Sequence, residues 1–221
     1  VSYSMNFGDS FISPALYCKV RKNAINPITF ISEEGYFQTT PFNPGNIFEY
    51  GFQFSGTIKV FKSIMVNPFF KTFVTQTRVN ETGKDLNLTS RKEAGVETGL
   101  SAIASLKHDF TVSFQFQFNS PKIDLQNRYY SDPLWFLSLE KSVGKNLKLG
   151  VTSAIPLTKT FTYHGNKIES EQLKAYSEGR LELPAVPLFF KIRYQFNSGK
   201  RDSRRNQSRE DIIEMPEKGF N

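Results

Sequence analysis

Residues 110–119 alternate strictly between apolar and polar side chains, and this alternation constrains the fold more than any other feature of the sequence. The segment reads Phe-Thr-Val-Ser-Phe-Gln-Phe-Gln-Phe-Asn, so every second residue is apolar. A helix cannot place these residues on one face, whereas a β-strand does so automatically, because successive side chains of a strand point to opposite faces. The segment is therefore predicted to be a strand with one apolar face and one face of Ser, Thr, Gln and Asn.

The same period of two recurs along most of the chain and predicts an all-β protein. Clear alternation predicts strands at 52–60, 147–152 and 188–196, and less regular patterns predict strands near 3–7, 13–22, 64–79, 93–106 and 134–143. Residues 93–106 also suit a helix, since their apolar residues include Val96, Leu100 and Ile103. The neighbouring strands favour a strand here as well, which gives nine predicted strands in all.

The connections between these strands alternate between short and long. Short turns are expected near 8–11, 61–64, 106–109 and 143–146, and long connections near 23–46, 79–92, 119–133 and 157–185. A short helix is expected at 170–182, because Leu173, Tyr176 and Leu181 recur at a loosely helical spacing. An antiparallel up-and-down sheet with tight turns at one end and long loops at the other is typical of a transmembrane β-barrel, with short periplasmic turns and longer extracellular loops.

The apolar face of such a sheet points to lipid in a membrane barrel and inward in a soluble one, so alternation alone does not separate these classes. Aromatic residues near the strand ends favour the membrane barrel, because such barrels carry aromatic girdles at both interfaces. These residues are Tyr129, Tyr130, Trp135, Tyr194 and Phe196. No apolar run approaches the roughly 18 residues of a membrane-spanning helix. A soluble two-sheet protein with an aromatic core stays open as an alternative.

The two ends of the chain depart from the regular pattern. The sequence starts at Val1 inside a predicted strand, and nine antiparallel strands cannot close a bacterial barrel, whose strand number is even. We therefore expect further strands upstream, with residues 1–197 forming the C-terminal part of a barrel in the outer membrane. Residues 198–221 carry six basic and five acidic side chains and are predicted to be a disordered periplasmic tail rather than a nucleic-acid site.

The last predicted strand and its exit, residues 188–201, resemble the ending of TonB-dependent outer-membrane receptors, in the outer-membrane β-barrel family abundant in Bacteroidota. In that family the final strand ends in Tyr-x-Phe, followed by a Gly and a basic tail, as in the segment from Tyr194 and Phe196 onward. The strand end at 116–121 and the hairpin at 129–151 are similar to family segments in the same order. The resemblance covers most of residues 45–205.

This resemblance implies a barrel of about 22 strands with an N-terminal plug, and import of a scarce ligand driven by TonB. It implies as partners outer-membrane lipid, the barrel assembly machinery, TonB acting through a plug that lies outside this chain, and a ligand of the siderophore, glycan or peptide class. Residues 154–157, Ala-Ile-Pro-Leu, depart from the Asp-x-Phe-Asn segment that the family often carries. A barrel that serves as a scaffold without transport is therefore a second hypothesis, and a soluble β-sandwich binding module is a third.

Enzymatic chemistry is not expected. One cysteine and two histidines exclude a cysteine-rich zinc finger and argue against any His/Cys metal cluster. The sequence has no Gly-rich phosphate loop followed by a helix and no Gly-x-Ser-x-Gly elbow. We therefore predict no catalytic residue, no cofactor and no metal site.

Candidate ligand contacts are the aromatic residues of the long connections, because flat rings offer stacking surfaces to a sugar, a siderophore or another ligand. They are Tyr36, Phe37, Tyr129, Tyr130, Phe161 and Tyr163. Arg128 and Lys167 would meet an anionic ligand if they are not ordinary surface charges. The competing interpretation for all of these residues is packing within the loops or in an aromatic girdle.

Overall fold

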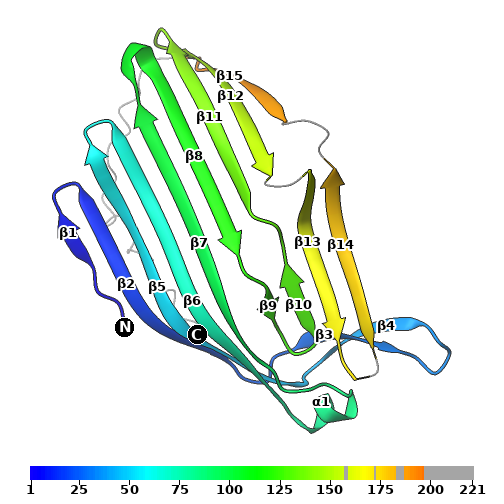
Figure 1. Cartoon of the computed structure of the whole chain (residues 1–221). Coiled ribbons are helices and arrows are strands. Elements are labelled where there is room, and N and C mark those ends of the chain that lie inside the picture. Colours follow the sequence, from blue (N-terminus) through cyan, green and yellow to red (C-terminus); the bar gives the residue numbers. More distant parts are fainter. Residues whose placement is uncertain (157–158, 172, 183–186, 197–221) are drawn as a thin grey trace, which may run out of the picture.

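Nine strands form one antiparallel sheet in the computed structural model of the chain, which describes residues 1–156, 159–171, 173–182 and 187–196 (Figure 1). In spatial order the strands are β1 (Met5–Phe7), β2 (Ser10–Arg21), β5 (Gly45–Phe61), β6 (Ile64–Val79), β7 (Lys92–Ser105), β8 (Phe110–Asn119), β11 (Leu134–Val143), β12 (Leu147–Pro156) and β15 (Leu188–Tyr194). This order follows the chain, so the predicted up-and-down sheet is confirmed. Residues 93–106, which also suited a helix, belong to strand β7.

The register of the strands places the apolar side chains on one face, as the alternation predicted. Val112 pairs with Ala104 and Leu139, and Leu139 pairs in turn with Val151. Large side chains on this face stay open to the surroundings, with Leu137 46% exposed and Phe190 82% exposed. Across the part of the chain that the structure describes, no second layer covers this face. The soluble two-sheet alternative, which needs an apolar face packed against another sheet, does not fit this arrangement.

The opposite face of the nine-stranded sheet is polar. The residues Ser113, Ser138 and Thr152 lie in one row across β8, β11 and β12. The hydroxyl oxygens of Ser138 and Thr152 are 2.7 Å apart, in hydrogen-bonding contact. We call this the lumen face, because the opposite, apolar face has the character of a lipid-facing surface.

Short and long connections lie at opposite ends of the sheet, as Figure 1 shows. The tight turns between β1 and β2, β5 and β6, β7 and β8, and β11 and β12 share one end, which we call the turn end. The four long connections leave from the other, which we call the loop end. Strand β15 finishes at the turn end, where Tyr194 pairs with Leu147. The expected tail at 198–221 lies outside the described residues.

The long connections contain regular structure of their own. The first holds a hairpin of β3 (Asn26–Ile31) and β4 (Phe37–Phe42), and the second holds the short helix α1 (Glu81–Asp85). The third and fourth together build a four-stranded sheet of β14 (Lys174–Glu182), β13 (Thr160–Glu169), β10 (Asn127–Tyr130) and β9 (Lys122–Ile123). Within the described residues, no helix has the length and apolarity that crossing a membrane requires.

The prediction of a short helix at 170–182 is wrong. Residues 174–182 form strand β14, which pairs antiparallel with β13. Lys174 lies opposite Glu169 at one end of the pairing, and Glu182 lies opposite Thr160 at the other. The turn between the two strands is fixed by Ser170, whose hydroxyl accepts a hydrogen bond from the main-chain N–H of Leu173 at 3.1 Å. Pairing with a neighbouring strand outweighs a loosely helical spacing, since a short isolated helix is marginal in water.

Most of the buried apolar residues lie in the loop-end layer and not between the strands of the wall. They are Ala24, Ile28, Leu88, Ile123, Leu125 and Leu173, whereas Ile47 of β5 and Phe73 of β6 are buried residues of wall strands. Hydrogen bonds tie the separate connections together: Asn80 donates from its side-chain amide to the carbonyl of Asn43 at 2.9 Å. The main-chain N–H of Glu171 donates to the carbonyl of Asn87 at 3.2 Å. The four connections therefore form one packed layer above the sheet.

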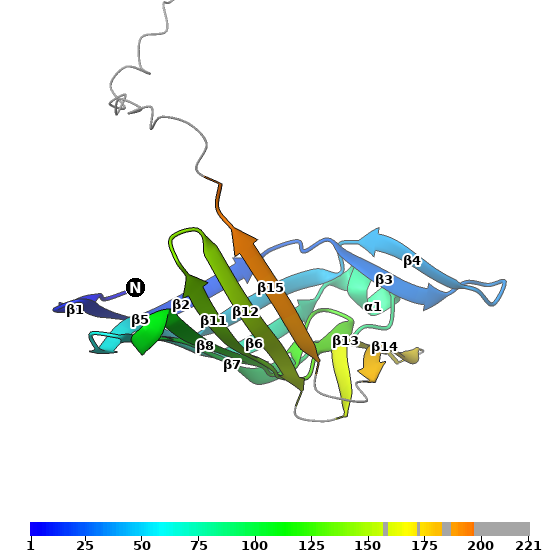
Figure 2. The ribbon, with the colours of Figure 1, turned by 90° about the horizontal axis from the view of Figure 1, so that it is seen from above.

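The nine-stranded sheet is open at both edges. Its edge strands are β1 and β15, which do not pair with each other in the described structure. Figure 2 shows the sheet from above as a twisted, unclosed wall. Strand β12 continues through the segment that departs from the family pattern, since Ala154 pairs with Phe136. Leu157, the last residue of that segment, lies outside the described residues.

Candidate functional site

A cavity of about 440 Å³ opens between the lumen face of the sheet and the loop-end layer. Its lining comes from β7, β8, β9, β10 and β13 and from the segments next to them. The residues are Glu97, Gln117, Asn119, Ser120, Lys122, Tyr129, Tyr130, Ser131, Tyr163 and His164. The pairing of β10 with β13 brings Tyr129 and Tyr130 close to Tyr163, although more than 30 residues separate them in the sequence. Three of the six predicted ligand-contact residues therefore meet in one cavity, which we call the tyrosine cavity.

Tyr129 has contacts at its hydroxyl and at its ring. Its hydroxyl donates a hydrogen bond to Oδ2 of Asp124 at 3.2 Å, and its ring centroid lies 6.4 Å from that of His164. Burial of the phenol, together with the nearby Asp124 carboxylate, raises the pKa of Tyr129 to about 12. Both effects disfavour the phenolate, because burial penalises charge and a second negative charge repels it. At neutral pH Tyr129 therefore presents an uncharged aromatic ring and hydroxyl to the cavity.

Tyr130 and Tyr163 each lie against a glycine of the neighbouring strand. Tyr130 covers Gly165 of β13, and Tyr163 covers Gly179 of β14, so closely that any Cβ at either glycine would collide with the ring. The Tyr130 hydroxyl also donates a hydrogen bond to Glu178. This hydrogen bond raises the pKa of Tyr130 and lowers that of Glu178. The glycines thus fix how the two rings lie beside the cavity.

The other predicted contacts lie elsewhere. Tyr36 and Phe37 lie at the tip of the β3–β4 hairpin, 67% and 69% exposed, and do not line the cavity. Phe161 lies in β13 opposite Leu181 of β14 and is also absent from the cavity lining. The sequence grouped these residues with the tyrosines because all of them are aromatic residues of long connections, a criterion that says nothing about distance.

The two basic residues singled out from the sequence have partners within the layer. Arg128 pairs with Glu93 of β7, which ties β10 to the wall. The ammonium group of Lys167 lies 5.5 Å from the centre of the Tyr130 ring, in a cation–π contact. Neither residue lines the tyrosine cavity, so the structure gives neither of them a position for binding an anion there.

Several lining residues were not among the predicted contacts. Gln117 and Asn119 belong to the polar face of the most regular strand, so their orientation was predictable from the alternation. Lys122 and His164 carried no sequence signal, because nothing local relates them to the strands beside them. Glu97 and Lys122 form an ion pair at the cavity wall. The charges of the cavity are thus largely neutralised by each other.

That ion pair ends a row of charged groups on the lumen face. The hydroxyl of Tyr17 donates to Glu49 at 3.0 Å, and the ammonium group of Lys71 donates to the same carboxylate at 2.9 Å. Lys71 also lies 3.7 Å from the carboxylate of Glu97, which is paired with Lys122. The row crosses β2, β5, β6, β7 and β9 and connects the wall to the base of the cavity.

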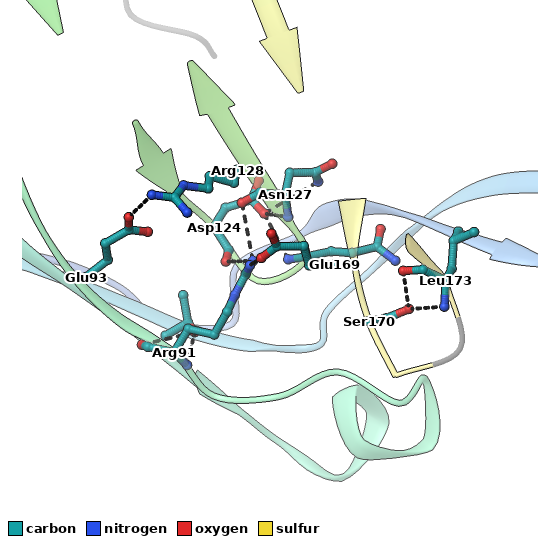
Figure 3. A network of polar contacts seen from close by, with 10 residues as sticks. Arg91, Glu93, Asp124, Asn127, Arg128, Glu169, Ser170 and Leu173 are labelled. Atoms are coloured by element: carbon teal, nitrogen blue, oxygen red, sulfur yellow. Dashed lines mark hydrogen bonds and ion pairs between the residues drawn. The ribbon is translucent and has the colours of Figure 1, made fainter. Parts of the chain in front are cut away.

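A second polar network fixes the β9–β10 turn on which Tyr129 depends (Figure 3). Arg91 donates to Glu169 at 2.8 Å and to the main-chain carbonyl of Asp124 at 2.8 Å. The Asp124 carboxylate accepts from the main-chain N–H groups of Gln126 and Asn127, at 2.9 and 2.7 Å. These contacts join the residue directly before wall strand β7, the β9–β10 turn and β13, and through Asp124 they hold Tyr129 in place.

An up-and-down sheet with one lipid-like face, an unclosed edge on each side and folded loops at one end defines an outer-membrane barrel wall. Comparison with known families agrees with this class. Residues 1–176 match the outer membrane protein beta-barrel family, which is most of the chain, and the protein belongs to this family. Neither the curated proteins nor the solved structures contain a significant match.

Membership in this family gives the location of the wall, and the lengths of its connections give its orientation. The protein is in the outer membrane, and the nine-stranded sheet is part of a transmembrane β-barrel. Barrels of this kind have short periplasmic turns and longer extracellular loops. The turn end is therefore periplasmic, and the loop-end layer with its tyrosine cavity lies on the extracellular side.

Proposed function

We propose that this chain forms wall and extracellular loops of a TonB-dependent outer-membrane receptor that imports a scarce ligand. The observation that carries the proposal is the unclosed sheet. Eight strands are enough to close a small barrel whose interior is filled by side chains. Here nine strands leave β1 and β15 as free edges in the part of the chain that the structure describes. A wall that stays open at this strand number supports a wide barrel, and barrels of about 22 strands house plugged import channels.

The cavity supports ligand capture at the extracellular mouth of that channel. Tyr129, Tyr130 and Tyr163 present rings and hydroxyls, and Gln117 and Asn119 add side-chain amides from the wall itself. Aromatic rings with a few placed polar groups are the usual composition of a small-ligand site. Because the wall contributes to the lining, a ligand bound here would already lie above the lumen. TonB would act through a plug, which these residues do not include.

Genetics tests the transport step. A strain lacking the gene and a strain lacking tonB are grown on a panel of single carbon sources and of iron chelates. We expect both deletions to abolish growth on the same nutrient, since import through the barrel requires energy from TonB. A nutrient whose use depends on the gene but not on tonB would contradict the proposal and would favour an outer-membrane barrel without active transport.

A paired variant tests the cavity in the same strains. Tyr129→Ala combined with Tyr163→Ala should lower uptake of the identified nutrient at limiting concentration and leave the amount of barrel in the membrane unchanged. Tyr176→Ala is the matched control, because Tyr176 is a highly exposed tyrosine of the same layer outside the tyrosine cavity. Equal uptake by both variants would remove the cavity from the ligand path. No observation on the described residues favours the non-transporting scaffold over import.

A further inference from the structure

The lipid-facing surface of the wall has an unequal distribution of charge. The nine strands contain four carboxylates, Glu49, Glu93, Glu97 and Glu140, and all four lie on the lumen face in ion pairs. The described strands carry three charged residues on the lipid face, namely Arg78, Lys92 and Lys141. All three are cations at the ends of their strands. The lipid face is therefore apolar in the middle and positive at its margins.

The margins at the two ends are built alike. The guanidinium carbon of Arg78 lies 5.0 Å from the ring centre of Phe48 at the loop end, and the ammonium of Lys141 lies 4.9 Å from that of Phe110 at the turn end. Each cation thus places its charged group over an aromatic ring at the border of the apolar band. Long basic side chains behave in this way at membrane interfaces, where the stem is in hydrocarbon and the head reaches the polar layer.

The loop-end margin contains two of these cations side by side. Lys92 of β7 pairs with Gln76 of β6, and Arg78 follows two residues later on the same face. Diagonal neighbours of this kind are roughly 7–8 Å apart in an antiparallel sheet, a distance that two long side chains can close around one anion. Both side chains are exposed, and neither has an acidic partner among the described residues.

We propose that Arg78 and Lys92 bind a phosphate group of a phosphorylated acyl glycolipid of the lipid A type in the outer leaflet. The phosphate would give an anionic partner to two cations that have no acidic partner among the described residues. The acyl chains would lie along the apolar side chains directly below, where Val74 pairs with Ala94 and Tyr50. Because of this apolar contact, the site would bind a phosphate group carried by a lipid in preference to free inorganic phosphate. The proposal rests on the family and the register, and it holds whether or not the barrel imports a ligand.

Native mass spectrometry of the whole protein, purified from the outer membrane in mild detergent, tests the site. The protein is delipidated and titrated with bis-phosphorylated lipid A and, separately, with the same lipid after removal of both phosphates. We expect tighter binding of the phosphorylated form. In the double variant Arg78→Gln, Lys92→Gln the affinity for phosphorylated lipid A should fall about 30-fold, because each cation near an anionic surface strengthens binding roughly fivefold.

Lys141→Gln is the matched control, because Lys141 has the same kind of ring contact at the periplasmic margin. The affinity of the Lys141→Gln variant for lipid A should equal that of the wild type. Heat-modifiable mobility in gel electrophoresis reports whether each variant barrel is folded. If the double variant fails to fold, the comparison of the two lipids on the wild-type protein still decides. Equal binding of both lipids by the wild type, or equal loss in the Lys141 variant, would overturn the proposal.

Discussion

The side-chain amide of Gln126 forms two hydrogen bonds with the main chain of Thr29, which lies 97 residues earlier in the sequence. Its oxygen accepts from the Thr29 N–H at 2.9 Å, and its nitrogen donates to the Thr29 carbonyl at 2.7 Å. Gln126 is 1% exposed, so water cannot replace either bond. One side chain thus pairs with the free edge of β3 as a neighbouring strand would, and it joins the first extracellular loop to the third.

Replacement of Gln126 by methionine should release the β3–β4 hairpin. Methionine keeps the size of the side chain and removes both hydrogen bonds, which together contribute about 2 kcal/mol to closing the hairpin. We expect the Thr29 amide to exchange with deuterium about 30-fold faster. Hydrogen exchange with mass spectrometry measures this, with Gln38→Met on the exposed face of β4 as the control. Unchanged exchange at Thr29 would show that other contacts hold the hairpin.

Arginine at position 114 should damage the barrel far more than arginine at position 115. Phe114 lies on the lipid face between Ala102 and Leu137, whereas Gln115 lies on the lumen face opposite Ser101 and Phe136. An arginine facing lipid near the midplane costs about 2–4 kcal/mol. We expect Phe114→Arg to reduce the amount of folded barrel in outer-membrane fractions, and Gln115→Arg to have a much smaller effect. Equal loss in both variants would mean that the two faces are assigned the wrong way round.

Loss of Lys71 should destabilise the wall, because Lys71 lies between Glu49 and Glu97 on the lumen face. Its side chain is 14% exposed, and removal of one partner from such a pair costs about 3 kcal/mol through the carboxylate left behind. Urea unfolding of Lys71→Met in detergent measures the change. Lys59→Met is the control, since its ion pair with Asp9 is largely exposed and should contribute little. A similar midpoint for both variants would show that water in the lumen solvates Glu49.

Tyr129 should make the loop-end layer sensitive to alkaline pH. The folded-state pKa of about 12 exceeds the ordinary value of 10, so the layer favours the neutral phenol. This stabilisation is fully present below pH 10 and is lost as the pH rises through 12. The difference in ultraviolet absorbance between wild type and Tyr129→Phe should titrate near pH 12.

Asp124→Asn separates the two causes of the shift in the pKa of Tyr129. Burial of the phenol has the larger effect, and the Asp124 carboxylate adds to it. The variant should therefore move the Tyr129 titration part of the way back toward 10 without reaching it. A titration that stays at 12, or one that returns fully to 10, would mean that the balance between burial and charge is different.

Much of the wall could be predicted from the sequence, because the information that specifies it is local. The alternation in 110–119 predicts both the strand and its two faces, and the pairing of Phe114 with Leu137 agrees with that prediction. Strand order could be predicted as well, since short turns force consecutive strands to pair as antiparallel neighbours. The helix prediction at 170–182 failed because the competing interaction, pairing with β13, is not encoded in the segment itself.

The cavity was decided by the tertiary structure. The sequence singled out Tyr129, Tyr130 and Tyr163 together with Tyr36, Phe37 and Phe161, and only the pairing of β10 with β13 separates the first three from the rest. Contacts such as Gln126 with Thr29, or Arg91 with Glu169, join residues 78 to 97 positions apart. Such contacts depend on where the sheet places the bases of the loops, because no periodicity within a loop records which other loop it will meet. The sequence by itself thus determined the wall and its two faces, and the fold of the loops decided which side chains share a site.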